Sequence, residues 1–276
     1  MNCDVSVIMP AYNSSDTLGR ALDSIYGQSL PPREIIVVDD GSDDWEKSRR
    51  IAASYPEAIA LRFIHTHKNQ GVSSARNMGI SLAQCRYLAF LDSDDAWYRN
   101  KLAIQYGLMT TGNLDFSMHQ YRDDMNCLRC DDEDVDSHDR SLCLSSLTSW
   151  TPLLRNDNTS CVMVLKQKMV SYDTSLRRGE DFTLYMELLS RRGCRAAYIK
   201  RVLAGAFKRT LGASGLSGDV KAMHCGRMDA LKKLLDRNKI GLAQYSFGIG
   251  TETLKYPLRV LRISLRRAAA SREGSR

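Results

Sequence analysis

Residues 87–95 carry the run Tyr87-Leu88-Ala89-Phe90-Leu91-Asp92-Ser93-Asp94-Asp95, in which an apolar stretch leads directly into three carboxylates. The apolar stretch is typical of a buried strand in a parallel sheet. Open α/β sheets bind ligands in the crevice beyond the carboxyl ends of their strands, which is where the aspartates fall. Clustered carboxylates raise one another's pKa unless a cation joins them, and a hard divalent cation is the usual partner. The alternative is an acidic turn in which Asp95 caps a following helix.

Two earlier stretches end in the same way. The apolar segments 5–9 and 34–38 lead into Pro10-Ala11-Tyr12-Asn13 and Asp39-Asp40-Gly41-Ser42, respectively. Strands that alternate with helices form right-handed βαβ units on a parallel sheet, so the polar strand ends lie along one edge. We expect this edge to be the functional site. The helical patterns between the strands occupy residues 15–28, 44–55 and 72–83.

Five segments resemble the motifs of the family 2 glycosyltransferases, which are inverting enzymes with the nucleotide-sugar-binding fold called GT-A. Their order and spacing match those motifs over about the first two thirds of the chain. The resemblance implies an α/β fold with a mostly parallel, twisted sheet flanked by helices. We expect a helical, basic carboxyl-terminal extension to follow it. The segments are residues 5–13, 35–42, 69–77, 92–95 and Gly179-Glu180-Asp181.

The domain organisation follows from these motifs. We expect a GT-A domain at residues 1–210, with a nucleotide-sugar-binding half at 1–122 and an acceptor half at 140–210, and a helical extension at 211–276. The Asp-rich residues 123–139 are typical of a solvated loop between the two halves. The Gly-rich residues 211–218 indicate either a loop that closes over the donor or a simple linker.

Composition favours a cytoplasmic enzyme. The chain has 276 residues, enough to bury a substantial core, and no apolar run approaches the roughly 20 residues needed to span a bilayer. The first strand begins within a few residues of Met1, which leaves no room for a signal peptide. The eight cysteines are scattered, as expected of reduced thiols, and the pair Cys127 and Cys130 resembles half a zinc site without a second pair.

Charge is concentrated at the carboxyl-terminal end. Residues 191–276 carry a net charge of +15, whereas residues 1–190 carry −8. A helix beginning near Pro257 would place Leu258, Leu261, Leu265 and Ala269 on one face, next to Arg259, Arg262 and Arg266. Such a helix can bind an anionic membrane surface, which predicts a peripheral location on the inner face of the plasma membrane. The alternative is a terminal helix docked on the domain. No nucleic-acid-binding motif accompanies the basic residues.

The resemblance also assigns roles to residues at the predicted edge. It implies that Asp94, helped by Asp92, holds Mg²⁺ or Mn²⁺ that bridges the diphosphate oxygens of the donor. It further implies that Asp181 is the general base that takes a proton from the acceptor hydroxyl. On the pattern alone, capping of the helix that follows is the favoured role of Asp181, and the two roles are compatible.

A nucleoside pocket is implied in the same way. Pro10 and Tyr12 are expected to line the pocket beneath the base, and Asp40 to accept a hydrogen bond from a uracil-type N–H. Asp39 is expected to contact the ribose or to stabilise the turn. Arg76 follows Gly71 on a predicted helix and is expected to reach the diphosphate or the base.

The implied reaction is transfer of a sugar, with inversion, from a nucleotide-diphosphate sugar such as a UDP-sugar to a hydroxyl of a glycan acceptor. The Gln-x-x-Arg-Trp motif of processive members is absent, which favours one sugar per encounter. The basic tail favours a lipid-linked oligosaccharide acceptor, as in bacterial surface polysaccharide assembly. Two alternatives stay open: a nucleotidyltransferase, although residues 10–17 lack a Gly-rich phosphate loop, and a non-catalytic nucleotide-sugar-binding module.

Overall fold

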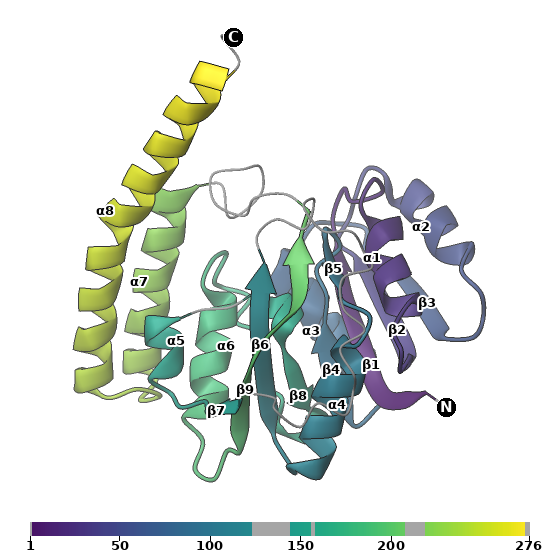
Figure 1. Cartoon of the computed structure of the whole chain (residues 1–276), viewed down its shortest axis with the longest axis horizontal. Coiled ribbons are helices and arrows are strands. Elements are labelled where there is room, and N and C mark those ends of the chain that lie inside the picture. The colour runs from purple at the N-terminus through teal and green to yellow at the C-terminus, as the bar shows by residue number, and fades with distance from the viewer. Residues whose placement is uncertain (1, 123–143, 156–157, 208–218, 274–276) are drawn as a thin grey trace.

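The computed structural model describes residues 2–122, 144–155, 158–207 and 219–273, and Figure 1 shows their arrangement. The strands form one nine-stranded sheet in the order β3-β2-β1-β4-β8-β6-β9-β5, with β7 beside β9. The acidic loop, the Cys127–Cys130 pair and the Gly-rich segment at 211–218 lie outside the described residues. The domain boundary at residue 211 therefore stays a prediction.

The amino-terminal half builds the parallel part of the sheet, as predicted. β1 is paired in parallel with both β2 and β4, and β3 lies parallel to β2. Helices follow β1, β2 and β3, at the places where the helical patterns indicated them. The elements are β1 (Cys3–Ala11), α1 (Leu18–Tyr26), β2 (Pro32–Asp39), α2 (Trp45–Ala53), β3 (Ala60–His65), α3 (Val72–Leu82) and β4 (Tyr87–Phe90).

The second half of the sheet is mixed, which differs from the expectation of a mostly parallel sheet. β8 runs antiparallel to both β4 and β6, and β9 runs parallel to β6 but antiparallel to β5 and β7. The elements are β5 (Asp95–Trp97), α4 (Lys101–Thr111), β6 (Phe116–Arg122), β7 (Leu144–Ser146), α5 (Thr151–Leu154), η1 (Thr159–Cys161), β8 (Met163–Leu165), η2 (Lys166–Lys168), α6 (Glu180–Leu189) and β9 (Ala196–Ala206).

Helices cover both faces of the sheet, which explains why its central strands are apolar throughout. On β1, Val7 and Met9 belong to the core under α1 and α4, whereas Ile8 belongs to the core under α3 and α6. Gly79 lets α3 approach β1 closely, since a Cβ at this position would lie 2.5 Å from the Ile8 side chain. The strands β1, β2 and β4 are thereby largely buried, whereas the edge strand β3 is partly exposed.

Two carboxyl-terminal helices, α7 (Val220–Asp236) and α8 (Leu242–Glu273), stand side by side at the end of the molecule opposite α2 (Figure 1). α7 confirms the helix expected after Asp219, whose side chain accepts a hydrogen bond from the Ala222 amide. The helix expected to begin at Pro257 begins instead at Leu242, with Pro257 inside it. Gly248 and Pro257 are poor helix formers, so local propensity does not predict a helix that includes both. Packing of Gly248 against Leu231 of α7 stabilises the helix in spite of that propensity.

The described cysteines Cys3, Cys85, Cys161, Cys194 and Cys225 are free thiols. None of the helices in the described residues combines the length and the apolar content that crossing a bilayer demands.

Candidate active site

The end of β2 forms a tight, buried turn. The Asp39 carboxylate accepts hydrogen bonds from the amide and the hydroxyl of Ser42, at 3.1 and 2.5 Å, and contacts His65 Nδ1 at 2.8 Å. Gly41 has φ +70°, and a Cβ there would lie 2.6 Å from the Asn69 amide of the neighbouring loop. Asp39 therefore stabilises the turn, which is one of the two roles expected for it.

Asp40 joins this turn to the loop before α3. Its two carboxylate oxygens accept hydrogen bonds from the amides of Gln70 and Gly71, at 2.9 and 2.7 Å. Asp40 is buried, so these bonds replace the water that it loses. The hydrogen bond expected from a nucleobase N–H to Asp40 stays a prediction, and in the structure both carboxylate oxygens of Asp40 accept from the protein backbone.

Pro10 and Tyr12 lie at the end of β1, beside that turn. Pro10 is buried opposite Val38 of β2, whereas the Tyr12 side chain is 52% exposed at the sheet edge. An exposed aromatic ring at the carboxyl end of a parallel strand offers a flat face to a ligand. This arrangement agrees with the expected nucleoside pocket, whose occupant stays a prediction.

The acidic segment turns between β4 and β5, and its last residue is structural. Asp95 is buried and accepts hydrogen bonds from the hydroxyls of Ser160 and Tyr121, both at 2.6 Å. Burial, followed by the charge of Asp92, raises the pKa of Asp95 to about 8. The Ser160 hydroxyl also accepts a hydrogen bond from the Asp92 amide at 3.1 Å, which fixes the turn. The interpretation of Asp95 as a helix cap is wrong, since Asp95 begins β5.

Arg76 connects this turn to the second half of the chain. Its guanidinium contacts Asp92 at 2.8 Å and Glu180 at 3.1 Å, and its side chain is only 4% exposed. The charges of Asp92 and Glu180 hold the pKa of Arg76 well above its usual range, against the effect of burial. The structure shows Arg76 as a buried bridge between two carboxylates, and its expected contact with the donor stays a prediction.

Asp181 lies in the first turn of α6, directly after Glu180. Gly179 precedes the helix with φ +80°, and the Phe182 amide donates to the Asp181 carboxylate at 2.6 Å. Burial and the charge of Asp181 raise the pKa of Glu180 to about 7, whereas Arg76 opposes this shift. Glu180 is therefore committed to Arg76, and Asp181 is the carboxylate of this pair that is less buried.

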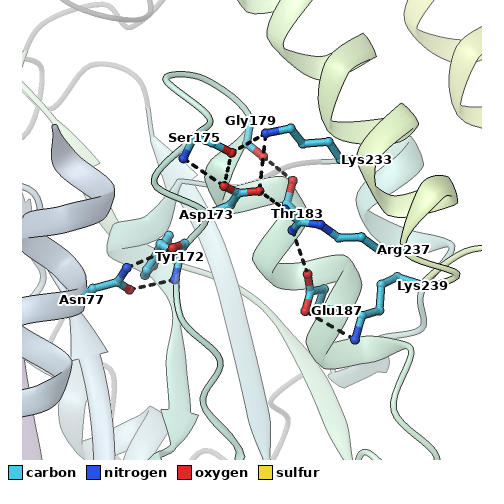
Figure 2. Close-up of polar contacts among 10 residues, drawn as sticks. All are labelled: Asn77, Tyr172, Asp173, Ser175, Gly179, Thr183, Glu187, Lys233, Arg237 and Lys239. Carbon is cyan, nitrogen blue, oxygen red and sulfur yellow. Dashed lines mark hydrogen bonds and ion pairs between the residues drawn. The ribbon is translucent and has the colours of Figure 1, made fainter. Parts of the chain in front are cut away.

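A loop backs the Arg76 bridge on its other side. The Asn77 side chain exchanges two hydrogen bonds with the backbone of Tyr172, at 2.8 and 2.9 Å, as Figure 2 shows. The Arg76 guanidinium lies 5.2 Å from the centroid of the buried Tyr172 ring. Asn77 thus fixes α3 to this loop, and the sequence analysis missed the contribution of Tyr172.

The metal expected at Asp92 and Asp94 fits the chemistry of this turn. Carboxylate oxygens are the ligands that Mg²⁺ and Mn²⁺ prefer, and Mg²⁺ in particular is often held by one or two carboxylates together with substrate phosphates. Within the described residues, no group of three or more His, Cys, Asp or Glu side chains is arranged to hold a metal by itself. A metal at this turn would take Asp92 and Asp94 together with other oxygen ligands, such as those of a donor phosphate.

Known proteins are similar to this chain in sequence and in fold. Residues 6–130 match the family model described as Glycosyl transferase family 2. The UDP-Glc:alpha-D-GlcNAc-diphosphoundecaprenol beta-1,3-glucosyltransferase WfgD of Escherichia coli is 27% identical over 187 residues, which are 67% of this chain and 69% of WfgD. The succinoglycan biosynthesis protein ExoO of Rhizobium meliloti is 30% identical over 227 residues, or 75% of this chain and 63% of ExoO.

Coverage varies among the curated relatives. An uncharacterized glycosyltransferase of Rickettsia felis is 38% identical over 118 residues, which are 43% of this chain but 19% of that protein. The chain thus spans about a fifth of the length of this relative.

Solved structures extend the likeness to nearly the whole chain. TarS of S. aureus in complex with UDP-GlcNAc superposes with a TM-score of 0.66 at 18% identity, over 90% of this chain and 70% of that one. The mannosyltransferase PcManGT of Pyrobaculum calidifontis, in complex with GDP-Man and Mn²⁺, gives 0.62 at 19% identity, over 98% of this chain and 76% of that one. These identities establish the shared GT-A fold alone.

The acidic ends of β2 and β4 and the Glu180–Asp181 turn lie on this fold in the order expected from the motifs. Together with the family match over residues 6–130 and the named relatives, they show that residues 6–130 carry a glycosyl transferase family 2 domain.

Proposed function

We propose that the protein is an inverting, non-processive glycosyltransferase that moves a sugar from a UDP-sugar to a hydroxyl of a lipid-linked glycan. The observation that carries this proposal is the Arg76 bridge. It joins the Asp92 turn at the end of β4 to Glu180, next to Asp181 at the start of α6. A group suited to hold a donor diphosphate and a group suited to accept a proton therefore belong to one site.

Donor binding is assigned to the strand ends of the amino-terminal half. The exposed ring of Tyr12 would stack on the nucleobase, while Asp39 and Asp40 hold the adjacent turn and loop in a fixed shape. Asp94, with Asp92, would hold the divalent metal, which stabilises the negative charge that grows on the leaving diphosphate. PcManGT, whose complex contains GDP-Man and Mn²⁺, supports such a metal.

The chemical step is assigned to Asp181. Its carboxylate would accept the proton of the acceptor hydroxyl while that oxygen attacks C1 of the sugar from the face opposite the leaving group. The C1–O bond to the β-phosphate breaks, and the nucleotide diphosphate leaves with the electron pair. One displacement inverts the anomeric centre and requires no covalent nucleophile.

The acceptor and the location rest on the carboxyl-terminal helix. Leu254, Leu258 and Leu261 of α8 are 71, 65 and 56% exposed and fall on one side of the helix. The side chains of Arg262, Arg266 and Arg267 lie outside the described residues, but their sequence places positive charge beside this stripe. An apolar stripe next to arginines favours an anionic membrane surface, where lipid-linked acceptors reside. WfgD, named for a diphosphoundecaprenol-linked acceptor, supports the same class.

A nucleotide-sugar panel tests the proposal. The protein is incubated with UDP-, GDP- and dTDP-sugars and Mn²⁺, with and without diphosphoundecaprenol-linked sugars, and the released nucleotide and the product anomer are measured. We expect UDP to be released in the presence of acceptor, with an inverted product. Release of pyrophosphate would indicate a nucleotidyltransferase, and binding without release would indicate a non-catalytic module.

A further inference from the structure

The carboxyl-terminal helix α7 packs directly on the turn that presents Asp181. Gly179, which precedes α6, and Gly226 of α7 face each other, and a Cβ on Gly179 would lie 3.0 Å from the Gly226 carbonyl oxygen. A Cβ on Gly226 would lie 2.6 Å from the Arg178 Cβ and 2.9 Å from the Arg178 carbonyl oxygen. Two glycines thus allow a contact between backbones that side chains would separate.

The next residue of α7 reaches over α6. The Arg227 guanidinium carbon lies 3.6 Å from the ring centroid of Phe182, the residue that follows Asp181. Arg227 also donates a hydrogen bond to the Pro152 carbonyl oxygen at 2.9 Å, which joins α7 to α5. The α7 helix therefore contacts the residues on both sides of the Glu180–Asp181 pair.

Arg227 brings a positive charge to the first turn of α6, where it lies over Phe182. Burial lowers the pKa of Arg227 to about 10, and the charge of Asp181 opposes this shift ahead of that of Glu252. Glu252 already contacts Arg259 at 2.5 Å and His224 at 3.6 Å. Arg227 stays charged near neutral pH and favours a negative charge on its neighbour.

The other end of α7 holds the loop behind Arg76. Arg237 contacts Asp173 at 2.8 Å and Glu187 of α6 at 3.9 Å, and Lys233 contacts Asp173 at 3.6 Å. Figure 2 shows these cations reaching from α7 toward the loop and α6, with Asn77 on the far side of Tyr172. The α6 helix is thereby held by α7 at its first turn and near its last.

We infer that α7 sets the position of Asp181, with Gly226 and Arg227 as positioning residues for the general base; this role rests on the function proposed above. The extension is then part of the catalytic machinery, although its own residues do not touch the reacting atoms. A displacement of about 1 Å at a reacting group can lower turnover about 100-fold.

Substitutions at Gly226 and Arg227 test this inference. Gly226→Ala forces α7 away from Arg178, and Arg227→Met removes the charge while keeping an apolar contact with Phe182. We expect kcat for transfer to fall about 10- to 100-fold in each, with the KM and the Kd for UDP-sugar within about twofold of wild type. Arg227→Lys, which keeps the charge, should recover most of kcat.

Two control variants separate positioning from general disturbance. Gly250→Ala makes the same change in α8, where a Cβ meets nothing within 4 Å, and Lys221→Met removes a charge from the exposed face of α7. Both should match wild type. Wild-type kcat in folded Gly226→Ala, or a parallel loss of donor binding in Arg227→Met, would overturn the positioning role. If Gly226→Ala does not fold, the kcat values of Arg227→Met and Arg227→Lys decide whether the positioning role holds.

The positioning role and the proposed function fail in different ways. If Asp181→Asn transfers at the wild-type rate, the base assignment is wrong whatever the α7 variants do. If Asp181→Asn is inactive while Gly226→Ala and Arg227→Met match wild type, only the positioning role is wrong.

Discussion

The two halves of the molecule hold their polar side chains in different ways. At the end of β2, the carboxylates are fixed by residues of the same βαβ units, as Asp39 is by Ser42 and Asp40 is by Gly71. In the second half, the contacts cross the chain. Arg76 pairs with Glu180, 104 residues away, and Lys255 donates to the Leu153 carbonyl oxygen, 102 residues away.

From this difference we expect donor binding to depend on the strand ends of the first half and the chemical step to depend on the second half. The ends of β1 and β2 form a cradle within the parallel sheet that is suited to hold a nucleotide, whereas the acidic turn after β4 is also tied to the second half through Ser160. Asp181 belongs to a helix whose position depends on Arg76 and on α7. Substitutions in the first half should therefore lower turnover by weakening donor binding. Substitutions in the second half should lower turnover while donor binding stays intact. Each substitution below tests this division.

The largest effect on turnover is expected at Asp94. Asp94→Ala should abolish transfer and remove the Mn²⁺ dependence of UDP-sugar binding together, because a diphosphate beside this edge needs the metal as counter-charge. Calorimetry with and without Mn²⁺ measures the binding, and Asp229→Ala on the exposed face of α7 is the matched control. Donor binding with unchanged Mn²⁺ dependence in Asp94→Ala would show that Asp94 holds no metal.

Removing the Arg76 bridge should affect both halves. Arg76→Met leaves Asp92 and Glu180 without their cation, so we expect a loss of about 3–5 kcal/mol in the free energy of unfolding and a drop in turnover of roughly tenfold or more. Urea unfolding and a transfer assay measure the two effects.

Arg62→Met is the matched control for the bridge. It breaks the 2.6 Å contact of Arg62 with the buried Glu34, away from the acidic strand ends. We expect it to destabilise the fold while leaving turnover per folded molecule unchanged. An equal loss of turnover in the Arg62 variant would mean that Arg76 acts on stability alone.

The exposed stripe of α8 should affect location without affecting turnover on soluble substrates. Replacing Leu258 and Leu261 by serine removes apolar area, and we expect binding to phosphatidylglycerol-rich vesicles to fall at least about tenfold. Leu242→Ser removes a leucine that is 72% exposed at the opposite end of α8 and should bind as wild type does. Co-sedimentation at low and high salt measures the binding, and undiminished binding of the double variant would assign the stripe another role.

The smallest effect on turnover is expected at Lys101, a buried cation of the first half. Its substitution should instead change how the free energy of unfolding depends on pH. Its Nζ lies 3.7 Å from the Trp97 ring centroid, and burial lowers its pKa to about 7. Because the unfolded chain keeps the ordinary, higher pKa, it binds more protons above pH 7, so this lysine makes the free energy of unfolding rise with pH.

Lys101→Met isolates this contribution. Between about pH 7 and 8.5, the gain in stability with pH should be smaller in the variant by roughly 1–2 kcal/mol, and the variant should be more stable at pH 7. The difference between the two proteins is needed, because the raised pKa values of Asp95 and Cys3 act in the opposite direction. Urea unfolding at both pH values measures it, and equal slopes would show that Lys101 is charged when folded above pH 7.

Sequence patterns predicted the first half well because its determinants are local. The apolar runs of β1, β2 and β4, and the carboxylates that follow β2 and β4, are adjacent in the chain, so strand, turn and site residue appear together. The Arg76–Glu180 pair joins distant segments, and nothing next to Arg76 indicates its partner. The same holds for Gly226, whose role depends on the approach of α7 to Gly179. Pro257 misled the prediction of α8, because tertiary packing overrode its local preference.

Asp181→Asn tests the division between binding and chemistry most directly. The amide keeps the size of the side chain and its place in the first turn of α6, so the fold and the strand-end cradle should survive. Transfer and Mn²⁺-dependent UDP-sugar binding are measured on the same preparation. We expect transfer to fall roughly 10²- to 10⁴-fold, the usual cost of losing a general base, with the donor Kd unchanged within about twofold. Near-wild-type transfer by the folded variant, or loss of donor binding in step with transfer, would contradict the assignment of Asp181.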